Sequence, residues 1–583
     1  MKVKHIILFL VGILSLSCQE KEASRPPNVI LIITDDQGYG DLGIHKNPNI
    51  ITPAIDAFAK KSIRFNNFHV SPVCAPTRSS LMTGRYSLRT GIRDTYNGGA
   101  IMAASEFTLA EMLKKVNYTT GIFGKWHLGD NYPSRPSDQG FDESLIHLAG
   151  GIGQVGDFTN YFKMETSYFD PVLWHNNKQR VYKGYCSDIF TQNAIDFIEK
   201  NHDQPFFCYL SFNAPHTPLQ VPDKYYQIYR GIDPSEGIDP KLLPLADMNE
   251  KSDEDARRVY AMVTNIDDNL NQLFQKLEVL GIEENTIVIF MTDNGPQQAR
   301  FVGGMRGRKS SVHQGGIRVP FFISYPSKYS GNREMNQMAA HIDLVPTLSQ
   351  LCGAPLPKDR KIDGRSFVPA LEGKTLSERS FFSYWTRKFP EKYNNVALQR
   401  GNYKLIGKKD FDADVEDFEL YNLKEDPFEI NNLVGQGKEK ATSLKTEMDA
   451  FISELTSSPN LVNPPRIAIG TPYENPVYLN RNDAGGQRGV WNQEKIFSYW
   501  KVDLEKGVYD LKFKFLKPLD GSGEMFLELG QSILKKHNPL PNLDQLVWKG
   551  VTLPKGKFDL IPFYRKQRGS NFFPLWVEIK KVE

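Results

Sequence analysis

Uninterrupted apolar runs dominate the hydrophobic pattern of the first half of the chain. The two clearest runs, residues 28–34 (NVILIIT) and 286–292 (TIVIFMT), are rich in β-branched residues. A run without polar positions is typical of a strand covered on both faces. Shorter runs at 118–123, 206–212 and 321–326 predict further strands. The pattern therefore predicts an α/β fold built on a central sheet.

The C-terminal part of the chain alternates apolar and polar residues instead. In residues 508–515 and 575–579 every second residue is apolar, which predicts half-buried strands. A proline-rich segment, 457–465, precedes them, so we expect residues 457–583 to form an added all-β, sandwich-like domain. Its tryptophans either stack on sugar rings or, as is commoner in a β-sandwich, fill the core. These tryptophans are Trp491, Trp500, Trp548 and Trp576.

Two further units complete the predicted organisation. Residues 27–375 form the first domain, whose segment 341–351 has apolar residues three and four apart and predicts a helix. Residues 376–456 form a smaller α+β subdomain with a strand at 401–406. The last helix of this subdomain is expected to bury one face, made of Ala441, Leu444, Met448, Phe451 and Leu455.

The N-terminus has the pattern of an export signal. Lys2 and Lys4 precede an apolar run at 6–16, which is too short to span a bilayer and predicts a signal peptide. Cys18 follows Leu-Ser and resembles the acylated cysteine of a bacterial lipoprotein. We therefore expect a signal peptide at 1–18, a linker at 19–26, and a periplasmic or outer-membrane-anchored protein of a Gram-negative bacterium.

Charge and cysteine content exclude some functions. The 583 residues carry a formal charge of +3, and removal of Lys2 and Lys4 leaves 3 − 2 = +1. A nearly neutral chain gives no support for nucleic-acid binding, so an anionic substrate needs a local basic site. Cys208 lies in an apolar run and is predicted to be core, whereas a disulfide at Cys186 stays open.

Acidic and amide side chains follow the two longest apolar runs. Asp35 and Asp36 come directly after the first run, and Asp293 and Asn294 come directly after the second. Sites in open α/β sheets form at the carboxyl ends of the strands, so these four side chains are expected to meet. Adjacent carboxylates repel unless a cation lies between them. Because all four offer oxygen, a hard cation is predicted, with calcium favoured over magnesium.

A cysteine is predicted to lie at a helix N-terminus. Pro76 suits a first helical position and Gly84 provides a stop two turns later. The unpaired N–H groups at such a terminus favour an anion or a nucleophile at Cys74, and Arg78 adds a cation one turn on. A buried structural cysteine is the alternative.

The segment Cys74-Ala-Pro-Thr-Arg78 resembles the signature of the formylglycine-dependent sulfatases, of the arylsulfatase type. Further motifs follow in the family's order: Gly-Lys125-Trp-His127-Leu-Gly, Pro-His216-Thr-Pro, and a loop containing Lys309. Lys125 and His127 are two residues apart, so on an extended segment they are expected to share one face. The resemblance implies an alkaline-phosphatase-like central mixed sheet sandwiched by helices. This sequence has Arg308 and Gln314 where glycine and glutamate are common in that loop, so Arg308 and His313 are candidates for substrate choice.

The resemblance also implies roles for these residues. Cys74 is oxidised by a formylglycine-generating or anaerobic sulfatase-maturating enzyme and completes the shell of one Ca²⁺ ion. The other expected ligands are Asp35, Asp36, Asp293 and Asn294. Arg78 favours the ionised nucleophile, and Lys125 and Lys309 hold the sulfate. His216 protonates the leaving oxygen and also contacts the substrate, and His127 removes a proton from the nucleophile.

The expected function is hydrolysis of sulfate esters on an algal or host polysaccharide or oligosaccharide. One alternative is a phosphodiester or phosphonate monoester hydrolase that uses the same modified cysteine. Another, from a different class, is a catalytically dead polysaccharide-binding protein that relies on the aromatic residues of 457–583. The dizinc phosphatases of the wider superfamily fit less well, because Asn294 stands where their site needs a histidine.

Overall fold

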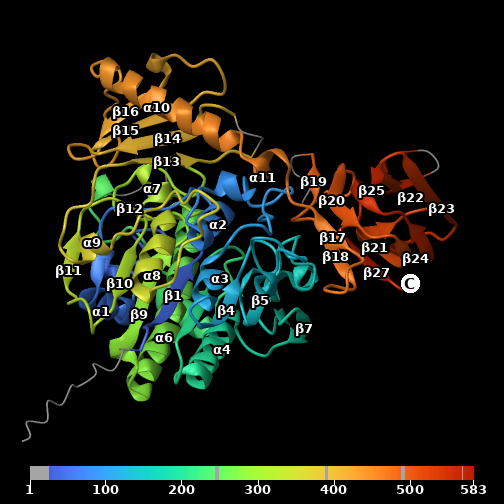
Figure 1. The fold of residues 1–583 in the computed structure, drawn as a ribbon, viewed down its shortest axis with the longest axis horizontal. Helices are drawn as coiled ribbons and strands as arrows, with labels where there is room; N and C mark the ends of the chain where they lie inside the picture. Colours follow the sequence, from blue (N-terminus) through green and yellow to red (C-terminus); the bar gives the residue numbers. More distant parts are fainter. Residues whose placement is uncertain (1–24, 243–247, 388–390, 488–492, 567–568) are drawn as a thin grey trace, which may run out of the picture.

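A computed structural model describes residues 25–242, 248–387, 391–487, 493–566 and 569–583. The chain forms a large α/β body, a smaller sheet-and-helix unit above it in the view of Figure 1, and an all-β unit at its side. The predicted signal peptide, Cys18 and Trp491 lie outside the described residues. None of the described helices is both long and apolar enough to cross a membrane.

A ten-stranded mixed sheet forms the centre of the large body. The strand order is β11-β2-β10-β9-β1-β8-β4-β5-β6-β7, and the five strands from β9 to β5 are mutually parallel. The predicted strands appear as β1, β4, β8, β9 and β10. The bounds are β1 (Asn28–Thr34), β2 (Ile63–Phe65), β4 (Thr119–Lys125), β5 (Glu143–His147), β6 (Val172–His175), β7 (Lys178–Val181), β8 (Phe206–Ser211), β9 (Thr286–Thr292), β10 (Phe321–Ser324) and β11 (Arg333–Met335). A two-stranded ribbon adds β3 (Phe68–His69) and β12 (Ala339–Ala340).

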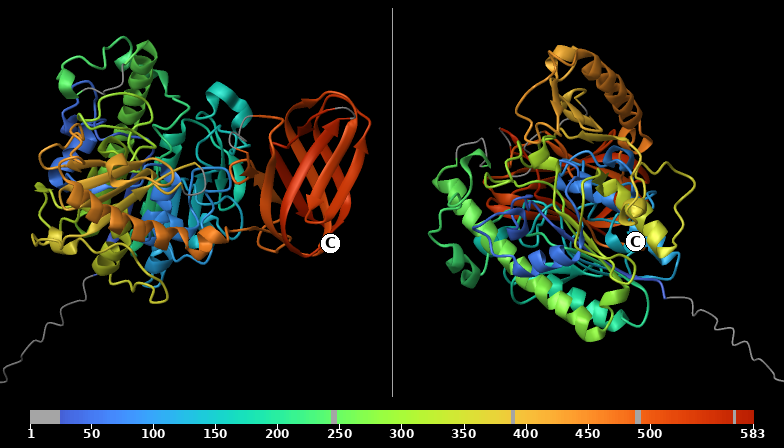
Figure 2. Two further views of the ribbon diagram at one scale, coloured as in Figure 1. Left: turned by 90° about the horizontal axis from the view of Figure 1, so that it is seen from above. Right: turned by 90° about the vertical axis from the view of Figure 1, so that its left-hand side faces the viewer.

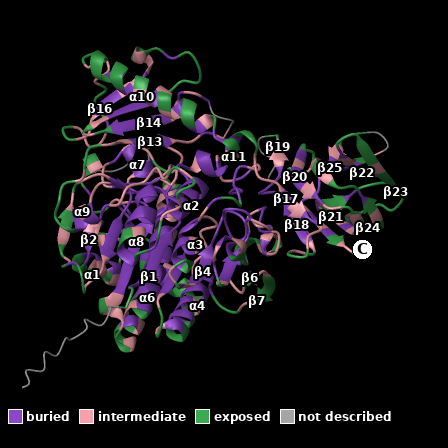
Figure 3. Cartoon of the chain, in the orientation of Figure 1, coloured by how far each residue is buried: buried purple, intermediate pink, exposed green. Residues whose placement is uncertain are grey.

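Helices cover both faces of this sheet, which explains the uninterrupted apolar runs. Val29, Leu31 and Ile33 of β1 pack with the helices of one face, and Ile30 and Ile32 pack with those of the other. The first group of helices is α2 (Cys74–Thr83), α3 (Leu109–Lys114), α8 (Leu344–Cys352) and α9 (Val368–Leu371). The second group is α1 (Pro53–Lys61), α4 (Cys186–Asn201) and α6 (Glu250–Leu280). The short helices α5 (Asp223–Tyr229), α7 (Gln314–Ile317) and α11 (Pro459–Val462) lie in connections. Figure 3 shows the central strands as buried.

The smaller unit is a four-stranded antiparallel sheet with one long helix. Its strands are β13 (Ser380–Tyr384), β14 (Asn394–Arg400), β15 (Tyr403–Lys408) and β16 (Glu419–Asn422), and the helix is α10 (Lys438–Thr456). Four of the five residues predicted for the inner face of α10 are buried, together with Ile452. Phe451 is only partly buried against the same cluster, which also contains Tyr86 and Leu88 of the large body.

The C-terminal part is a sandwich of two sheets (Figure 2), as predicted. One sheet has the order β17-β20-β25-β22-β23, with β19 and β26 attached, and the other has the order β18-β27-β21-β24. The first is built from β17 (Ile467–Ile469), β19 (Gly485–Gly486), β20 (Ser498–Leu504), β22 (Gly523–Leu529), β23 (Ser532–Asn538), β25 (Gly556–Lys566) and β26 (Asn571–Phe572). The second is built from β18 (Val477–Asn480), β21 (Gly507–Leu519), β24 (Leu543–Leu553) and β27 (Trp576–Lys581). Trp500 and Trp548 are buried in the shared core, so for these two the core interpretation is confirmed.

The cysteines of the described residues are unpaired. Cys74, Cys186, Cys208 and Cys352 are free and buried. Cys208 lies within β8 among core residues, as predicted. Cys186 begins α4 and forms no disulfide, which closes the possibility that the sequence left open.

Candidate active site

The polar residues that follow β1 and β9 meet at one edge of the sheet. Thr34 and Thr292, the last residues of the two parallel strands, are register partners, so the residues after them lie side by side. The Asp36 backbone N–H donates to Asp293 Oδ1 at 3.2 Å, and Asn294 Nδ2 donates to Asp36 Oδ1 at 2.8 Å. All four predicted residues, Asp35, Asp36, Asp293 and Asn294, are fully buried. The carboxyl-edge prediction is thus correct in its geometry.

Helix α2 places Cys74 at the same edge. The helix begins at Cys74 and ends before Gly84, which has a left-handed φ of 69°. Pro76 lies inside the first turn, so the helix starts two residues earlier than Pro76 indicated. The Cys74 side chain is 2% exposed, and its sulfur lies within 4.8 Å of a carboxylate oxygen from each of Asp35 and Asp293. Burial raises the pKa of the Cys74 thiol, although Lys125 and Lys309 act in the opposite direction.

Arg78 joins three strand ends on the buried side of α2. Its Nε and Nη2 donate to Asp293 Oδ2 at 3.1 and 2.8 Å. Its Nη1 donates to the Ser211 hydroxyl at 2.5 Å and to the Lys125 carbonyl at 3.2 Å. A planar guanidinium group can bind these three partners at once, since it offers several donors in fixed directions. Arg78 therefore fixes the carboxylate after β9 to the ends of β4 and β8.

Lys125 and His127 both point into the site, but for a different reason from the one predicted. An extended segment was expected to put them on one face. Instead β4 ends at Lys125, and His127 adopts a left-handed backbone with φ of 60°. The chain turns because Gly124, with φ of 119°, lies so close to β8 that a Cβ there would be 1.8 Å from the Ser211 carbonyl oxygen. Lys125 Nζ then donates to Asp35.

The hydrogen bonds of His127 fix its tautomer. Its Nε2 lies 2.7 Å from the carbonyl oxygen of Thr95, which can only accept, so Nε2 carries the proton. Its Nδ1 lone pair faces Cys74 Sγ at 3.5 Å. Burial and the charge of Lys125 lower the pKa of His127 well below its usual value. The residue is therefore a neutral base directed at the side chain of residue 74.

His216 and Lys309 reach the site from loops. His216 Nδ1 donates to the Thr217 carbonyl at 2.7 Å, which leaves Nε2 3.7 Å from Asp36 Oδ2. Lys309 Nζ donates to Asp36 Oδ1 at 2.7 Å. Burial and the nearby Lys309 lower the pKa of His216 to about 3. All the predicted catalytic and substrate-binding residues are thus brought together.

The loop that carries Lys309 is held by the smaller unit. Asn395 Nδ2 donates to the Ser310 carbonyl at 2.8 Å, and the Gln314 backbone N–H donates to Glu429 at 2.7 Å. His313 was a candidate for substrate choice, but it lies buried against Glu429 at 3.2 Å and does not line the catalytic cavity. Arg308 is exposed and lines a neighbouring cavity.

The donor atoms fit a hard divalent cation. Asp35 Oδ1 and Asn294 Oδ1 are buried and accept no hydrogen bond from the described residues, although a buried acceptor normally has a partner. Burial and the neighbouring Asp35 raise the pKa of Asp293 to about 7. A cation bound between the carboxylates would relieve their mutual repulsion. A site made only of carboxylate and amide oxygens favours calcium over zinc, which prefers histidine and cysteine ligands. The residues present therefore suit Ca²⁺.

The catalytic cavity has a volume of about 180 Å³ and contains several residues that the motifs did not indicate. Cys74, His127, His216 and Lys309 line it, as predicted. Its remaining polar lining includes Thr95, Gln154, Gln297, Ser310 and Arg387. Ser310 follows Lys309 in the predicted loop, but the other residues come from separate loops and from the start of the smaller unit, so no local sequence pattern identifies them.

The site lies at the edge of an α/β sheet and combines a buried nucleophile position with oxygen ligands for a cation. Two lysines can bind an anion, and two histidines can transfer protons. This combination defines a hydrolase for anionic esters. The sulfatase family model matches residues 27–354, and the chain belongs to this family. It is therefore a sulfuric ester hydrolase. A second model, described as the C-terminal part of N-sulphoglucosamine sulphohydrolase, matches residues 308–458.

Individual sulfatases are similar over most of their length. An arylsulfatase of Hemicentrotus pulcherrimus is 32% identical over 67% of this chain and 70% of its own. N-acetylgalactosamine-6-sulfatase of Mus musculus is 30% identical over 65% and 72%. Among solved structures, Ps i-CgsB has a TM-score of 0.64 and 27% identity, and covers 75% of this chain and 94% of its own. Ps i-CgsB has also been solved in complex with k-i-k-neocarrahexaose.

Proposed function

We propose that the protein removes sulfate esters from oligosaccharides or polysaccharides and that residue 74, as formylglycine, is the nucleophile. The observation that carries the proposal is the position of Cys74. It lies at the N-terminus of α2, beside carboxylates suited to a cation and within reach of the base His127. The sugar-directed names of the relatives, and the oligosaccharide complex of Ps i-CgsB, support a carbohydrate substrate.

The two groups that maturation and metal binding add have separate chemical tasks. Asp35, Asp36, Asp293 and Asn294 would hold Ca²⁺, and the ion would supply positive charge that favours an anionic nucleophile. The hydrated aldehyde of residue 74 would supply an oxygen nucleophile at sulfur, with an in-line leaving alcohol.

Lys125, Lys309 and Arg78 place positive charge beside the carboxylates of the site. Lys125 pairs with Asp35, and Lys309 pairs with Asp36. In the presence of a sulfate ester they bind its non-bridging oxygens, where negative charge must be stabilised in the transition state. Arg78 binds Asp293 through two guanidinium nitrogens, which orients this carboxyl group and opposes the rise in its pKa that burial causes.

The two histidines divide the proton transfers. His127 Nδ1 accepts a proton from the hydroxyl at residue 74, since its Nε2 proton is held by the Thr95 carbonyl. His216 donates from Nε2 to the leaving sugar oxygen. Its lowered pKa means that the free imidazole is neutral, so binding of the anionic ester must raise this pKa before His216 acts as an acid.

Maturation and export complete the proposal. The chain would need a formylglycine-generating or anaerobic sulfatase-maturating enzyme as a partner. The N-terminal pattern supports export, with acylation of Cys18 and a periplasmic or outer-membrane location in a Gram-negative bacterium. Mass analysis of the mature N-terminal peptide tests the anchor, and an unmodified Cys18 would exclude it.

The state of residue 74 gives the sharpest test. We expect the mass of the peptide that contains residue 74 to be lower than that of the cysteine form in protein co-expressed with a maturation enzyme. The fraction converted should equal the active fraction in aryl sulfate hydrolysis. Fully converted protein that leaves every sulfate ester intact would contradict the proposal.

Substitution separates a catalytic cysteine from a structural one. Cys74→Ala should lower kcat for aryl sulfate by at least ~10³-fold, because the nucleophile is lost. Cys352→Ala is the matched control, since Cys352 is also free and buried but lies at the end of α8. Equal activity of the two variants would favour a binding protein. Release of phosphate but not sulfate from paired aryl esters would favour the phosphoester alternative.

A further inference from the structure

We propose that a second cavity, which shares the lining residue Arg387 with the catalytic cavity, binds the anionic group of a neighbouring sugar residue, either a sulfate ester or a carboxylate. This inference rests on the proposed carbohydrate sulfatase function and specifies its substrate as an oligosaccharide with adjoining anionic residues. We call this space the junction cavity; its polar lining includes Arg93, Arg387, Asp483, Tyr499 and Lys501.

The junction cavity lies where three parts of the chain meet. Its volume is about 500 Å³, within the range of about 300–1,000 Å³ that is usual for small-molecule sites. The α/β body contributes Arg93, the proline-rich segment 461–465 forms one wall, and the β-sandwich contributes Tyr499 and Lys501. Arg387 lines both this cavity and the catalytic one, so the two spaces adjoin.

The charges in the cavity favour an anion. Three cationic side chains line it against a single carboxylate, that of Asp483. Asp483 is only 3% exposed, and its Oδ1 accepts a hydrogen bond from Asn482 Nδ2 at 3.3 Å. Arg93 donates to the Asn97 carbonyl at 2.8 Å and has no carboxylate within ion-pairing distance among the described residues. Lys501 contacts Asp559 at 3.3 Å, on a half-exposed side chain that does not line the cavity.

Arg387 is held in place before any ligand binds. Its guanidinium lies 4.7 Å from the centre of the Tyr96 ring and 5.2 Å from that of Trp385. One nitrogen lies 3.5 Å from Asp94 Oδ1, and Trp385 Nε1 donates to the same oxygen at 3.1 Å. The two aromatic rings and the Asp94 carboxylate restrain the guanidinium, which reduces the side-chain entropy that is lost when a ligand binds. A preorganised cation therefore stands between the two cavities.

The loop around Thr95 connects the junction cavity to His127 in the catalytic cavity. The Thr95 carbonyl accepts the Nε2 proton of His127, while Arg93 and Asn97 on either side of Thr95 line the junction cavity. The Gly98 backbone N–H donates to the Asn482 carbonyl of the β-sandwich at 3.4 Å. An anion held by Arg93 and Lys501 would thus fix the adjoining sugar with its sulfate at residue 74.

The test uses the matured full-length protein and size-matched trisaccharides of galactose or N-acetylhexosamine. All carry one sulfate ester on the central residue; the residue on either side carries a second sulfate, a carboxylate, or hydroxyls only. We expect kcat/KM for removal of the central sulfate to be about ten-fold higher when a neighbouring anion is present, through a lower KM. This preference should fall as ionic strength rises. The sulfate and carboxylate arms identify which anion is preferred.

Variants of the cavity give the decisive comparison. Arg93→Gln and Lys501→Gln should each reduce the preference for the charged trisaccharide by about five-fold or more. Lys506→Gln, an exposed lysine that follows the same strand, is the matched control and should retain the wild-type preference. Equal kcat/KM for charged and uncharged trisaccharides, or an unchanged preference in both cavity variants, would overturn the inference.

Failure of the proposed function gives a different result. If the matured wild-type protein removes sulfate from none of the trisaccharides, the carbohydrate sulfatase proposal itself fails. If it removes sulfate from all of them without regard to the neighbouring group, only the junction cavity is excluded.

Discussion

Arg78 illustrates how much of the site depends on single buried charges. The side chain is completely buried and pairs with Asp293, which is also completely buried. A buried ion pair is weak evidence for stability as a whole, but removal of one partner leaves an uncompensated charge. Because Arg78 also bonds Ser211 and the Lys125 carbonyl, its loss would loosen the ends of β4 and β8.

Arg78→Ala should therefore lower the free energy of unfolding by about 3–5 kcal/mol and reduce kcat. The control is Arg400→Ala, because Arg400 and Glu378 are 53% and 62% exposed and such pairs contribute roughly 0–1 kcal/mol. Urea unfolding curves of the two variants give the comparison. If Arg78→Ala is too unstable to purify, Arg78→Lys keeps a charge without the guanidinium fork and should show a smaller loss. Equal stability of Arg78→Ala and wild type would contradict this account.

At the scale of elements, the smaller unit holds the lysine loop through a buried charge network. Glu429 accepts a hydrogen bond from Lys404 Nζ at 2.6 Å and lies 3.2 Å from His313. Burial alone would raise the pKa of Glu429, but Lys404 and His313 outweigh it and hold the pKa at about 2. The carboxylate therefore supports the loop that carries Lys309 from a position outside the cavity.

Glu429→Gln should change how stability depends on pH. The pKa of Glu429 is lowered on folding, so its contribution is complete above the unfolded value of about 4.5 and is lost as pH falls through about 2. We expect the variant to be about 3 kcal/mol less stable than wild type at pH 7, since Lys404 is left buried and unpaired. The difference should shrink below pH 4.5. Glu425→Gln, at an exposed position, is the control in urea unfolding measured at several pH values.

The same variant tests the link to substrate. A loosened lysine loop should raise KM for aryl sulfate more than it lowers kcat, because Lys309 binds the sulfate. A variant that is destabilised but has an unchanged KM would show that Glu429 supports the fold without positioning Lys309.

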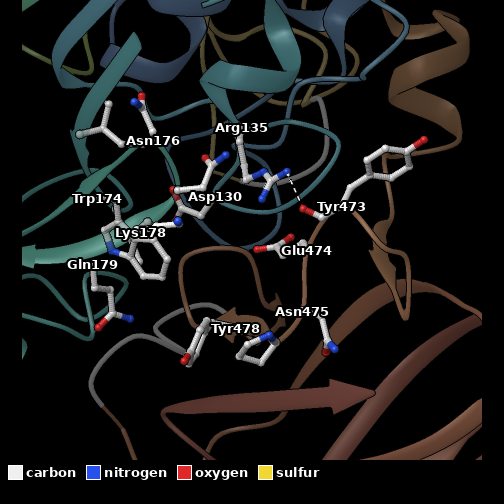
Figure 4. Close-up of a pocket in the computed structure, with 14 residues that line it drawn as sticks. Asp130, Arg135, Trp174, Asn176, Lys178, Gln179, Tyr473, Glu474, Asn475 and Tyr478 are labelled. Carbon is white, nitrogen blue, oxygen red and sulfur yellow. Dashed lines mark hydrogen bonds between the residues drawn. The ribbon is translucent and has the colours of Figure 1, made fainter. Parts of the chain in front are cut away.

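At the scale of the whole molecule, the β-sandwich docks on the α/β body through buried polar and aromatic contacts. Figure 4 shows Asp130 and Arg135 of the large body facing Glu474 and Tyr478 of the C-terminal part. Glu474 accepts from the Tyr132 backbone N–H at 2.7 Å, and Asn480 Nδ2 donates to Asp130 at 2.8 Å. Among the described tryptophans of this part, Trp576 lies outside the sandwich core, and it packs here against Phe158 with ring centres 5.4 Å apart.

Asp483 should make the stability of the contact between the β-sandwich and the α/β body depend on pH. Burial raises the pKa of Asp483 to about 6, and its charge also raises the pKa of the nearby Asp130. A carboxyl whose pKa is raised on folding contributes stability below its unfolded value of about 3.8 and loses it as pH rises through about 6. Asp483→Asn should therefore raise the melting temperature at pH 7.5 but not at pH 3.5. Asp503→Asn, on a partly exposed face of β20, is the control, and a pH-independent effect at Asp483 would contradict the prediction.

Local pattern was sufficient for the central strands and for the sandwich. The apolar runs of β1 and β9 predict strands that are buried on both faces, and the alternation in β21 predicts a strand that is buried on one face. The structure shows these burial patterns. The helix at Cys74 was also predicted, apart from its first turn, because Pro76 is tolerated anywhere in that turn. The geometric reason given for Lys125 and His127 was wrong, since the left-handed residue at 127 depends on the close contact of Gly124 with β8.

The amino-acid pattern was enough to predict the fold class, the carboxyl-edge cluster of Asp35, Asp36, Asp293 and Asn294, and the motif residues around Cys74. Each depends on residues close together in the chain or on the rule that parallel strands end at one edge. Three features follow from the folded arrangement alone: Thr95 sets the tautomer of His127, Glu429 holds the lysine loop, and Arg387 lines two cavities. These contacts join segments far apart in sequence, and their distances follow from packing, which no local pattern encodes.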